Sequence, residues 1–229
     1  IFAISNREIE LYKRYNPNVS FSPVPILPEE FVVARKSPRP AYGLRKDDFI
    51  FMCLGRVSRI KGQDLALKAF VKIKDKIPKA KLVLVGRSDY DPEMIDEIKE
   101  LAEQEDISDR FLMTDMIERD EVIAWLQHAD VHVIPVRFMN SGAVVAESWA
   151  GGTPVIQSDA VDPNLVEEGV NGYVFPNMDV DALAGKMLLA YQNRDKFPQL
   201  AAAGRKKVYA GFTYEVLIKK YQDVYDRLV

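Results

Sequence analysis

The feature that most constrains the fold is a regular alternation that begins at Asp48. Short, predominantly apolar runs recur at residues 49–54, 81–85, 111–114, 131–134, 154–157 and 173–175. Between them lie longer segments with apolar residues at helical spacing, as at Ala66, Phe70 and Ile73. Strands that lack polar alternation are buried on both faces. The alternation therefore predicts a doubly wound α/β fold, a parallel sheet with helices on both sides.

The helices of this fold are bounded by local signals. We expect helices at 64–77, 92–105, 120–128, 142–150, 179–193, 196–210 and 214–228. Gly151 and Gly152 are suited to end the fourth of these, because glycine adopts the left-handed conformation that closes a helix. Ahead of the sheet, a strand at 1–4 and a helix at 7–15 lead into a proline-rich stretch, 22–40, which predicts a linker and a domain boundary.

Composition excludes several functional classes. The formal net charge is -3, so no overall field favours nucleic acid or an anionic membrane. Cys53 is the single cysteine and has apolar neighbours, which predicts a core residue and a reducing, cytoplasmic location. No apolar run is long enough to span a bilayer. The chain begins at Ile1 without an initiator methionine, which suggests a fragment.

The loop after the first strand of the sheet predicts an anion site. Residues 55–62 read Gly-Arg-Val-Ser-Arg-Ile-Lys-Gly, with two glycines that permit close backbone approach and three cations. Arg56 offers a forked set of donors and Lys61 a compact charge, a combination suited to a diphosphate. The loop is neither a Walker A loop nor a G-x-G-x-x-G fingerprint. A solvated basic turn is the alternative interpretation.

A second loop precedes the predicted helix 142–150. Gly142 opens this helix, so the N–H groups of its first turn, with Ala143 and Val144, form a potential anion site. Glu147 lies more than one turn later, among small and apolar residues. A buried carboxylate needs hydrogen-bond donors, which a pair of ribose hydroxyls would supply. The alternative is a glutamate bonded to a protein neighbour.

The two loops resemble the donor-binding motifs of family-4 glycosyltransferases, a retaining group with the GT-B fold of two facing Rossmann-like domains. The family motifs read G-R-x-x-x-x-K-G and E-x-F-G-x-x-x-x-E-A-x-A-x-G-x-P-V. The matching positions are Gly55, Arg56, Lys61, Gly62, Gly142, Glu147, Ala150, Gly152, Pro154 and Val155. The resemblance covers the chain from Asp48 onward and implies the C-terminal, nucleotide-sugar-binding half of such an enzyme.

The resemblance also implies a role for each loop. Arg56 and Lys61 would be the catalytic residues, which hold the donor diphosphate and stabilise its charge as the sugar leaves. Glu147 would bind the ribose, and the loop 115–117 would meet the nucleobase largely through backbone groups. The other implied donor-binding residues are Gly55, Met116, Ile117, Met139, Asn140, Ser141, Gly142, Ala143 and Val144. Because cations and a helix dipole neutralise the leaving group, no metal or other cofactor is implied.

This sequence departs from the family at the residues that meet the donor sugar. The first glutamate of the family motif aligns with Met139, and its aromatic residue aligns with Ser141. A thioether cannot accept hydrogen bonds as a carboxylate does, although Asn140 could partly replace it. The departure leaves two interpretations open: an active enzyme with an unusual donor, or a catalytically degenerate glycosyltransferase-like binding module.

On the family pattern, residues 1–40 are the remnant of an N-terminal acceptor domain and linker, 41–213 the donor-binding domain, and 214–229 a C-terminal helix packed toward the N-terminal domain. The implied activity is that of a hexosyltransferase that uses a UDP- or GDP-sugar with retention of configuration. The fragment would be inactive without the acceptor domain, through which the enzyme could contact a membrane surface.

Other signals in the sequence favour ordinary structural roles. Asp89-Tyr90-Asp91 matches a D-x-D metal motif, but it precedes Pro92 and a helix, which predicts N-capping. His128 ends a helix and His132 lies in a strand, so the two histidines do not form a metal pair. A receiver-like signalling domain would need an acidic pocket at the strand ends, where this chain has basic residues.

Overall fold

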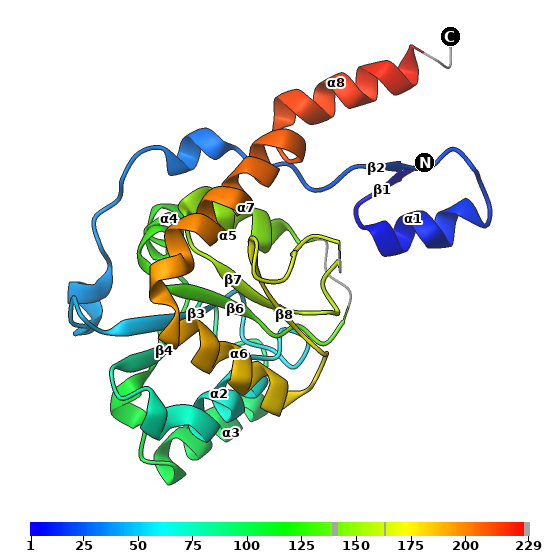
Figure 1. The fold of residues 1–229 in the computed structure, drawn as a ribbon. Helices are drawn as coiled ribbons and strands as arrows, with labels where there is room; N and C mark the ends of the chain where they lie inside the picture. Colours follow the sequence, from blue (N-terminus) through cyan, green and yellow to red (C-terminus); the bar gives the residue numbers. More distant parts are fainter. Residues whose placement is uncertain (139–141, 163, 227–229) are drawn as a thin grey trace.

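The computed structural model describes residues 1–138, 142–162 and 164–226 (Figure 1). Its centre is a six-stranded parallel sheet in the order β5-β4-β3-β6-β7-β8. The strands are β3 (Phe49–Leu54), β4 (Ala80–Val85), β5 (Phe111–Met113), β6 (Val131–Ile134), β7 (Val155–Ser158) and β8 (Gly172–Phe175). This order is that of a doubly wound sheet in which the direction of winding reverses between β3 and β6. The predicted fold class is confirmed.

Two layers of helices cover the sheet. One layer consists of α2 (Gln63–Ile73), α3 (Pro92–Gln104) and α6 (Val180–Gln192). The other consists of α4 (Arg119–His128), α5 (Ala143–Gly151) and α7 (Phe197–Gly211), on the opposite face in Figure 1. Alternate residues of β3 enter the two cores, with Phe51 and Cys53 in the first and Ile50 and Met52 in the second. All four are at most 1% exposed, as expected of a strand buried on both faces.

The structure confirms several buried positions and moves one helix end. Trp125, Trp149 and Cys53 lie in the core, and burial raises the pKa of the Cys53 thiol. The helix expected over 64–77 ends at Ile73 and continues as the short 3-10 helix η3 (Lys74–Lys76). Pro78 follows directly after Ile77 and disfavours helical geometry in that residue, which accounts for the end of η3 at Lys76.

The N-terminal segment and the last helix lie beside each other. β1 (Phe2–Ala3) pairs in parallel with β2 (Ser20–Phe21), and α1 (Asn6–Lys13) lies between them in the sequence. The final helix, α8 (Tyr214–Tyr225), extends from the sheet domain toward this unit (Figure 1). The Tyr221 ring lies edge-on to Phe2, with ring centroids 4.7 Å apart. The proposed boundaries at residues 40 and 213 remain predictions.

The proline-rich linker contributes to the core as well as connecting segments. Its 3-10 helices are η1 (Pro28–Phe31) and η2 (Arg39–Tyr42); two more, η4 (Ser108–Arg110) and η5 (Arg194–Lys196), lie later in the chain. Ile26 and Phe31 are buried in the same cluster as α4, α5 and α7. Gln127 donates from Nε2 to the Phe31 carbonyl at 3.0 Å. This part of the linker therefore packs with the sheet domain.

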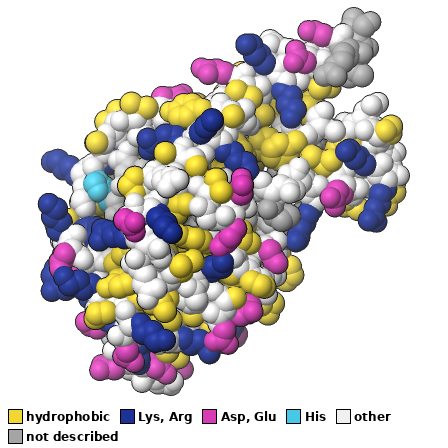
Figure 2. All heavy atoms as spheres, viewed as in Figure 1, with side chains coloured by type: hydrophobic (Ala, Val, Ile, Leu, Met, Phe, Trp, Pro, Cys, Tyr) yellow, Lys and Arg dark blue, Asp and Glu magenta, His cyan; other side chains and the backbone are white. Residues whose placement is uncertain are grey.

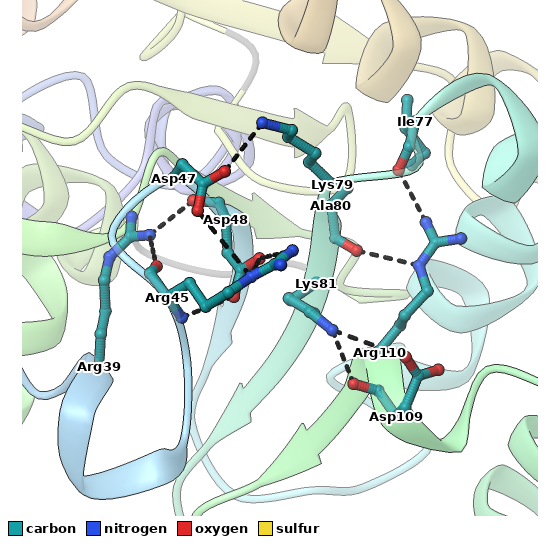
Figure 3. Close-up of polar contacts among 10 residues, drawn as sticks. All are labelled: Arg39, Arg45, Asp47, Asp48, Ile77, Lys79, Ala80, Lys81, Asp109 and Arg110. Atoms are coloured by element: carbon teal, nitrogen blue, oxygen red, sulfur yellow. Dashed lines mark hydrogen bonds and ion pairs between the residues drawn. The ribbon is translucent and has the colours of Figure 1, made fainter.

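Ion pairs and hydrogen bonds gather at the amino ends of β3, β4 and β5 (Figure 3). Lys79 pairs with Asp47 at 2.8 Å, and Lys81 donates to the Asp109 carbonyl at 2.8 Å. The Arg110 guanidinium bridges the carbonyls of Ala80 and Ile77 at 3.1 and 2.8 Å. These contacts tie the strand entries together at the edge opposite the predicted binding loops, so we assign them to the stability of the fold.

Candidate functional site

The two predicted loops meet at the edge of the sheet where ligands bind in folds of this class. The first loop follows β3 and the second follows β6, the neighbouring central strands between which the winding reverses. Their carboxyl ends open at this switch point, where a crevice forms because the adjoining connections turn to opposite faces. A cavity at this point is lined by Leu54, Lys61, Pro135, Val144 and their neighbours. The cationic loop and the first turn of α5 therefore face one cavity.

Glycines allow the close approach of these elements. Gly62 has φ +74°, and a Cβ at this position would lie 1.9 Å from the Pro135 carbonyl oxygen. Gly142 caps α5 with φ +76°, and a Cβ there would lie 2.1 Å from Leu165 Cδ2. A side chain at either site would combine backbone strain with a clash. At the other end of α5, Gly152 adopts φ +93° and caps the helix as predicted, whereas Gly151 is the last residue of the helix and does not have a positive φ.

The two cations of the first loop lie in different settings. The Arg56 side chain is exposed, and its guanidinium lies 4.2 Å from the centroid of the Tyr90 ring, a cation–π contact. Lys61 is half-buried and lines the cavity. Burial, with a smaller effect of the Arg56 charge, lowers the pKa of Lys61. The loop therefore holds positive charge that a bound anion would stabilise.

A buried ion pair holds the two loops together. Arg137, in the loop after β6, donates two hydrogen bonds to the Asp64 carboxylate of α2, at 2.8 and 2.6 Å. The Arg137 backbone N–H also donates to the Ile60 carbonyl at 2.9 Å. Burial alone would raise the pKa of Asp64, but the Arg137 guanidinium reverses this effect and the pKa is lowered. The sequence analysis missed this pair, because the two residues are 73 positions apart.

Gln63 stabilises the turn within the first loop. Its Oε1 accepts from the Ser58 N–H at 3.3 Å, and its Nε2 donates to the Arg56 carbonyl at 3.0 Å. The residue is 1% exposed and lines the cavity beside Lys61. The sequence analysis missed Gln63 too. A polar residue next to Gly62 in an otherwise apolar helical pattern was the available signal.

Glu147 has the protein partner that the sequence left as an alternative. Its carboxylate pairs with Arg119 Nη1 at 2.7 Å, and Arg119 Nη2 pairs with Glu30 at 2.8 Å. The Glu147 side chain keeps 19% of its surface exposed, so it is not sealed from solvent. Because the ion pair engages one carboxylate oxygen, ribose binding by Glu147 stays a prediction.

The third predicted loop follows β5 and lies beside the loop after β4, which in turn contacts the first loop. Asp115 has φ +59°, and Asp115 and Met116 line a hollow with Arg87, Ser88 and Asp89 at the ends of β4 and β5. Met116 is 77% exposed, whereas Ile117 packs against the core on the α4 and α5 side. Met116 is therefore available to a ligand, and Ile117 faces protein. Met139, Asn140 and Ser141, the predicted contacts of a donor sugar, lie outside the described residues.

The motifs that suggested metal sites have structural roles. Asp91 caps α3, where its side chain accepts from the Met94 N–H at 3.3 Å, and Asp89 pairs with Arg87. Within residues 1–138, 142–162 and 164–226, no group of three His, Cys, Asp or Glu side chains is arranged to hold a metal ion. In the same residues, no helix has the length and apolarity to cross a membrane. Figure 2 shows Lys and Arg as well as Asp and Glu side chains spread over the face that it draws.

Comparison with known proteins agrees with this geometry. Residues 34–207 match the family model described as glycosyl transferases group 1. A similar curated protein is the GDP-mannose-dependent alpha-(1-6)-phosphatidylinositol monomannoside mannosyltransferase of Mycobacterium tuberculosis. It is 29% identical over 198 residues, which are 83% of this chain and 50% of that protein. The chain spans about half the length of the curated relatives it matches.

Solved structures show the same fold. Sucrose-phosphate synthase from Thermosynechococcus elongatus is 26% identical with a TM-score of 0.83, over 99% of this chain and 57% of that one. HepE from Anabaena, crystallised with UDP and glucose, is 18% identical with a TM-score of 0.82, over 99% of this chain and 62% of that one. These likenesses confirm the Rossmann-like, GT-B type of fold that the loops predicted.

Proposed function

Because this chain belongs to the glycosyl transferases of group 1, we propose that it is the donor-binding half of a retaining glycosyltransferase. The whole enzyme transfers a hexose from a nucleoside diphosphate sugar to an acceptor. One observation above all supports this proposal: Lys61 and Val144, from the cationic loop and the first turn of α5, line the same cavity at the switch point. The cavity itself is only about 10 Å³, so a pyrophosphate would lie at its opening, with the cations of the loop on one side and the N–H donors of α5 on the other.

In this proposal, the site stabilises the leaving group. Arg56 and Lys61 hold the two phosphates, and the N–H groups of Ala143 and Val144 at the positive end of the α5 dipole assist them. As the bond to the sugar breaks, negative charge grows on the phosphate oxygens. Three fixed sources of positive potential lower the energy of that charge, so no metal ion is needed.

The nucleoside would extend along the carboxyl edge of the sheet. Glu147 holds the ribose hydroxyls through the carboxylate oxygen that does not pair with Arg119 Nη1. The nucleobase reaches the hollow beside Asp115 and Met116. The mannosyltransferase relative is GDP-mannose-dependent by name, and HepE was crystallised with UDP. We therefore propose a UDP- or GDP-sugar as the donor.

This half would bind donor but not turn it over alone. Residues 1–40 and α8 belong, in this proposal, to the junction with an N-terminal acceptor domain, which would also make any contact with a membrane surface. The buried Cys53 thiol and the reducing compartment that it favours are consistent with a cytoplasmic enzyme. No nucleic acid is expected as a partner, because the net charge is -3.

Calorimetric titration with UDP, GDP, UDP-glucose and GDP-mannose tests the proposal. We expect at least one nucleotide to bind, and Lys61→Ala to weaken its binding by about tenfold or more. Lys99→Ala, which removes an exposed cation on α3, is the matched control and should leave the affinity unchanged. Absence of binding for all four ligands at millimolar concentration would overturn the proposal.

A catalytically degenerate binding module is the second candidate, and it rests on Met139 at the position of the family glutamate. The two candidates differ in the activity of the full-length protein. If it transfers sugar at a normal rate, the module is excluded. If it is inactive and Met139→Glu restores transfer, the degenerate candidate is correct.

A further inference from the structure

A buried histidine lies where the two central strands separate. β3 pairs with β4 from Phe49 to Leu54, but it pairs with β6 through Phe51 with Val131 and Met52 with His132. Beyond this point the cavity opens between the strands. The Leu54 N–H donates instead to His132 Nε2 at 3.1 Å. The imidazole thus takes the place of a strand carbonyl as the acceptor for Leu54, which lines the cavity.

The hydrogen bonds continue from the imidazole to α5. Because Nε2 accepts from the Leu54 N–H, the proton of the neutral ring lies on Nδ1. His132 Nδ1 then donates to Ser148 Oγ at 2.6 Å, and Ser148 Oγ donates to the Val144 carbonyl at 2.7 Å. His132 is 1% exposed and Ser148 is fully buried. Burial, followed by the charge of Lys61, lowers the pKa of His132 to about 3, so the ring stays neutral.

This series of hydrogen bonds joins the two elements that the proposed function assigns to the diphosphate. Leu54 ends β3 and is followed by the cationic loop, and Val144 lies in the first turn of α5. Each hydrogen bond is directional, so the series opposes a shift of α5 relative to the end of β3. We propose that His132 and Ser148 are positioning residues, which hold the first turn of α5 at the spacing from the cationic loop that a diphosphate requires.

This inference rests on the proposed function and predicts a specific loss. Ser148→Ala removes the hydroxyl that links His132 to Val144 and so interrupts the series of hydrogen bonds. It should reduce the preference for diphosphate over monophosphate, measured as the Kd of UMP or GMP divided by that of UDP or GDP. We expect this ratio to fall by about tenfold, the effect of one displaced charge-assisted contact. The matched control is Thr153→Val, which removes a buried hydroxyl that donates to the Leu126 carbonyl at 2.6 Å, at the amino end of β7. Its ratio should equal that of the wild type, although its stability also falls.

The outcomes separate the two proposals. If the wild type binds neither UDP nor GDP, the proposed function fails. If it binds and Ser148→Ala changes the ratio no more than Thr153→Val does, the positioning role alone fails.

A second measurement requires no substitution among the residues that form these hydrogen bonds. In His128→Gln, His132 is the only histidine left, and its ¹⁵N resonances should show a proton on Nδ1. A proton on Nε2 would overturn the inference even if Ser148→Ala fails to fold.

Discussion

At the scale of single residues, the site depends on two cations with unequal surroundings. Arg56 is exposed and stacked on Tyr90, so solvent and the aromatic ring stabilise its charge. Lys61 is half-buried beside the cavity, where burial and then the Arg56 charge lower its pKa. A bound diphosphate would raise the pKa of Lys61 again, because it supplies opposite charge to a partly desolvated amine. Lys61 is therefore the residue whose protonation should report binding.

We predict that nucleotide binding takes up a proton at alkaline pH. Above its lowered pKa, free Lys61 is partly neutral, whereas the complex favours the protonated amine. Affinity should therefore fall as pH rises through the lowered pKa of free Lys61, below the ordinary lysine value of 10.5. Calorimetry in two buffers of different ionisation enthalpy measures the uptake directly. Lys61→Arg keeps a charge that does not titrate in this range, so its affinity should depend less on pH than that of the wild type. An equal pH dependence in this variant would contradict the assignment.

His132 predicts a dependence of stability on pH. Its pKa is about 3 in the folded protein, against an ordinary value of 6.5, so below pH 6.5 the unfolded chain binds a proton that the folded chain does not. Stability is therefore present above pH 6.5 and is lost as pH falls, by up to about 1.4 kcal/mol per unit. Urea unfolding of wild type and His132→Asn from pH 7 to about 4.5 isolates this contribution. Parallel curves for the two proteins would refute it.

At the scale of elements, the loops are positioned by close backbone approach. Gly62 allows the first loop to contact Pro135, and the Arg137–Asp64 ion pair stabilises this contact. Gly142 allows α5 to begin against Leu165. A Cβ at Gly62 would require movement of the Pro135 backbone, which lines the cavity, whereas a Cβ at Gly142 would require the Leu165 side chain to move. The secondary structure here sets the distance between the two sources of positive potential.

We predict that Gly62→Ala destabilises the protein more than Gly43→Ala. Both residues have positive φ, +74° and +68°, so both substitutions add strain of about 1–2 kcal/mol. A Cβ at Gly62 would also meet the Pro135 carbonyl, whereas nothing lies within 4 Å of one at Gly43. The clash should add about 1–3 kcal/mol to the loss, measured by urea unfolding. Equal losses at the two positions would contradict this account of the loop contact.

At the scale of the whole molecule, the linker and the last helix connect the sheet domain with the N-terminal unit. Ile26 and Phe31 fill the core layer formed by α4, α5 and α7. α8 leaves that layer and reaches β1 through Tyr221 and β2 through Lys220. Glu30, in the linker, pairs with Arg119, which also holds Glu147. The linker is thus bonded, through one arginine, to a residue of the candidate site.

The packing of the linker can be measured by a pair of neighbouring substitutions. Phe31 is 7% exposed, and Phe31→Ala should lower the free energy of unfolding by about 3 kcal/mol, because it leaves a cavity under η1. Val32 is 73% exposed, and Val32→Ala should change it by no more than about 0.5 kcal/mol. Urea unfolding compares the two. A small loss for Phe31→Ala would mean that the linker is a spacer without a role in the core.

Much of the architecture could be predicted from the sequence because its signals are local. Apolar runs, helical spacing and glycine at loop ends act over a few residues, and they predicted the six strands and the cap at Gly152. The handedness of parallel connections then restricts where successive strands can lie. The two loops after β3 and β6 were predicted to be functional for the same reason, because their signals are contiguous in the chain: cations between two glycines in the first loop, and in the second a glycine at a helix start followed by Glu147.

The partners of individual side chains were decided by the tertiary structure. Asp64 and Arg137, His132 and Ser148, and Glu147 and Arg119 meet across elements, at distances set by strand order and register. Each pair joins residues from different helices, strands or loops, so the local sequence pattern does not encode it. The sequence by itself determined which loops carry positive charge. Only the folded sheet, by bringing β3 and β6 together, decided that Lys61 and the first turn of α5 share a cavity.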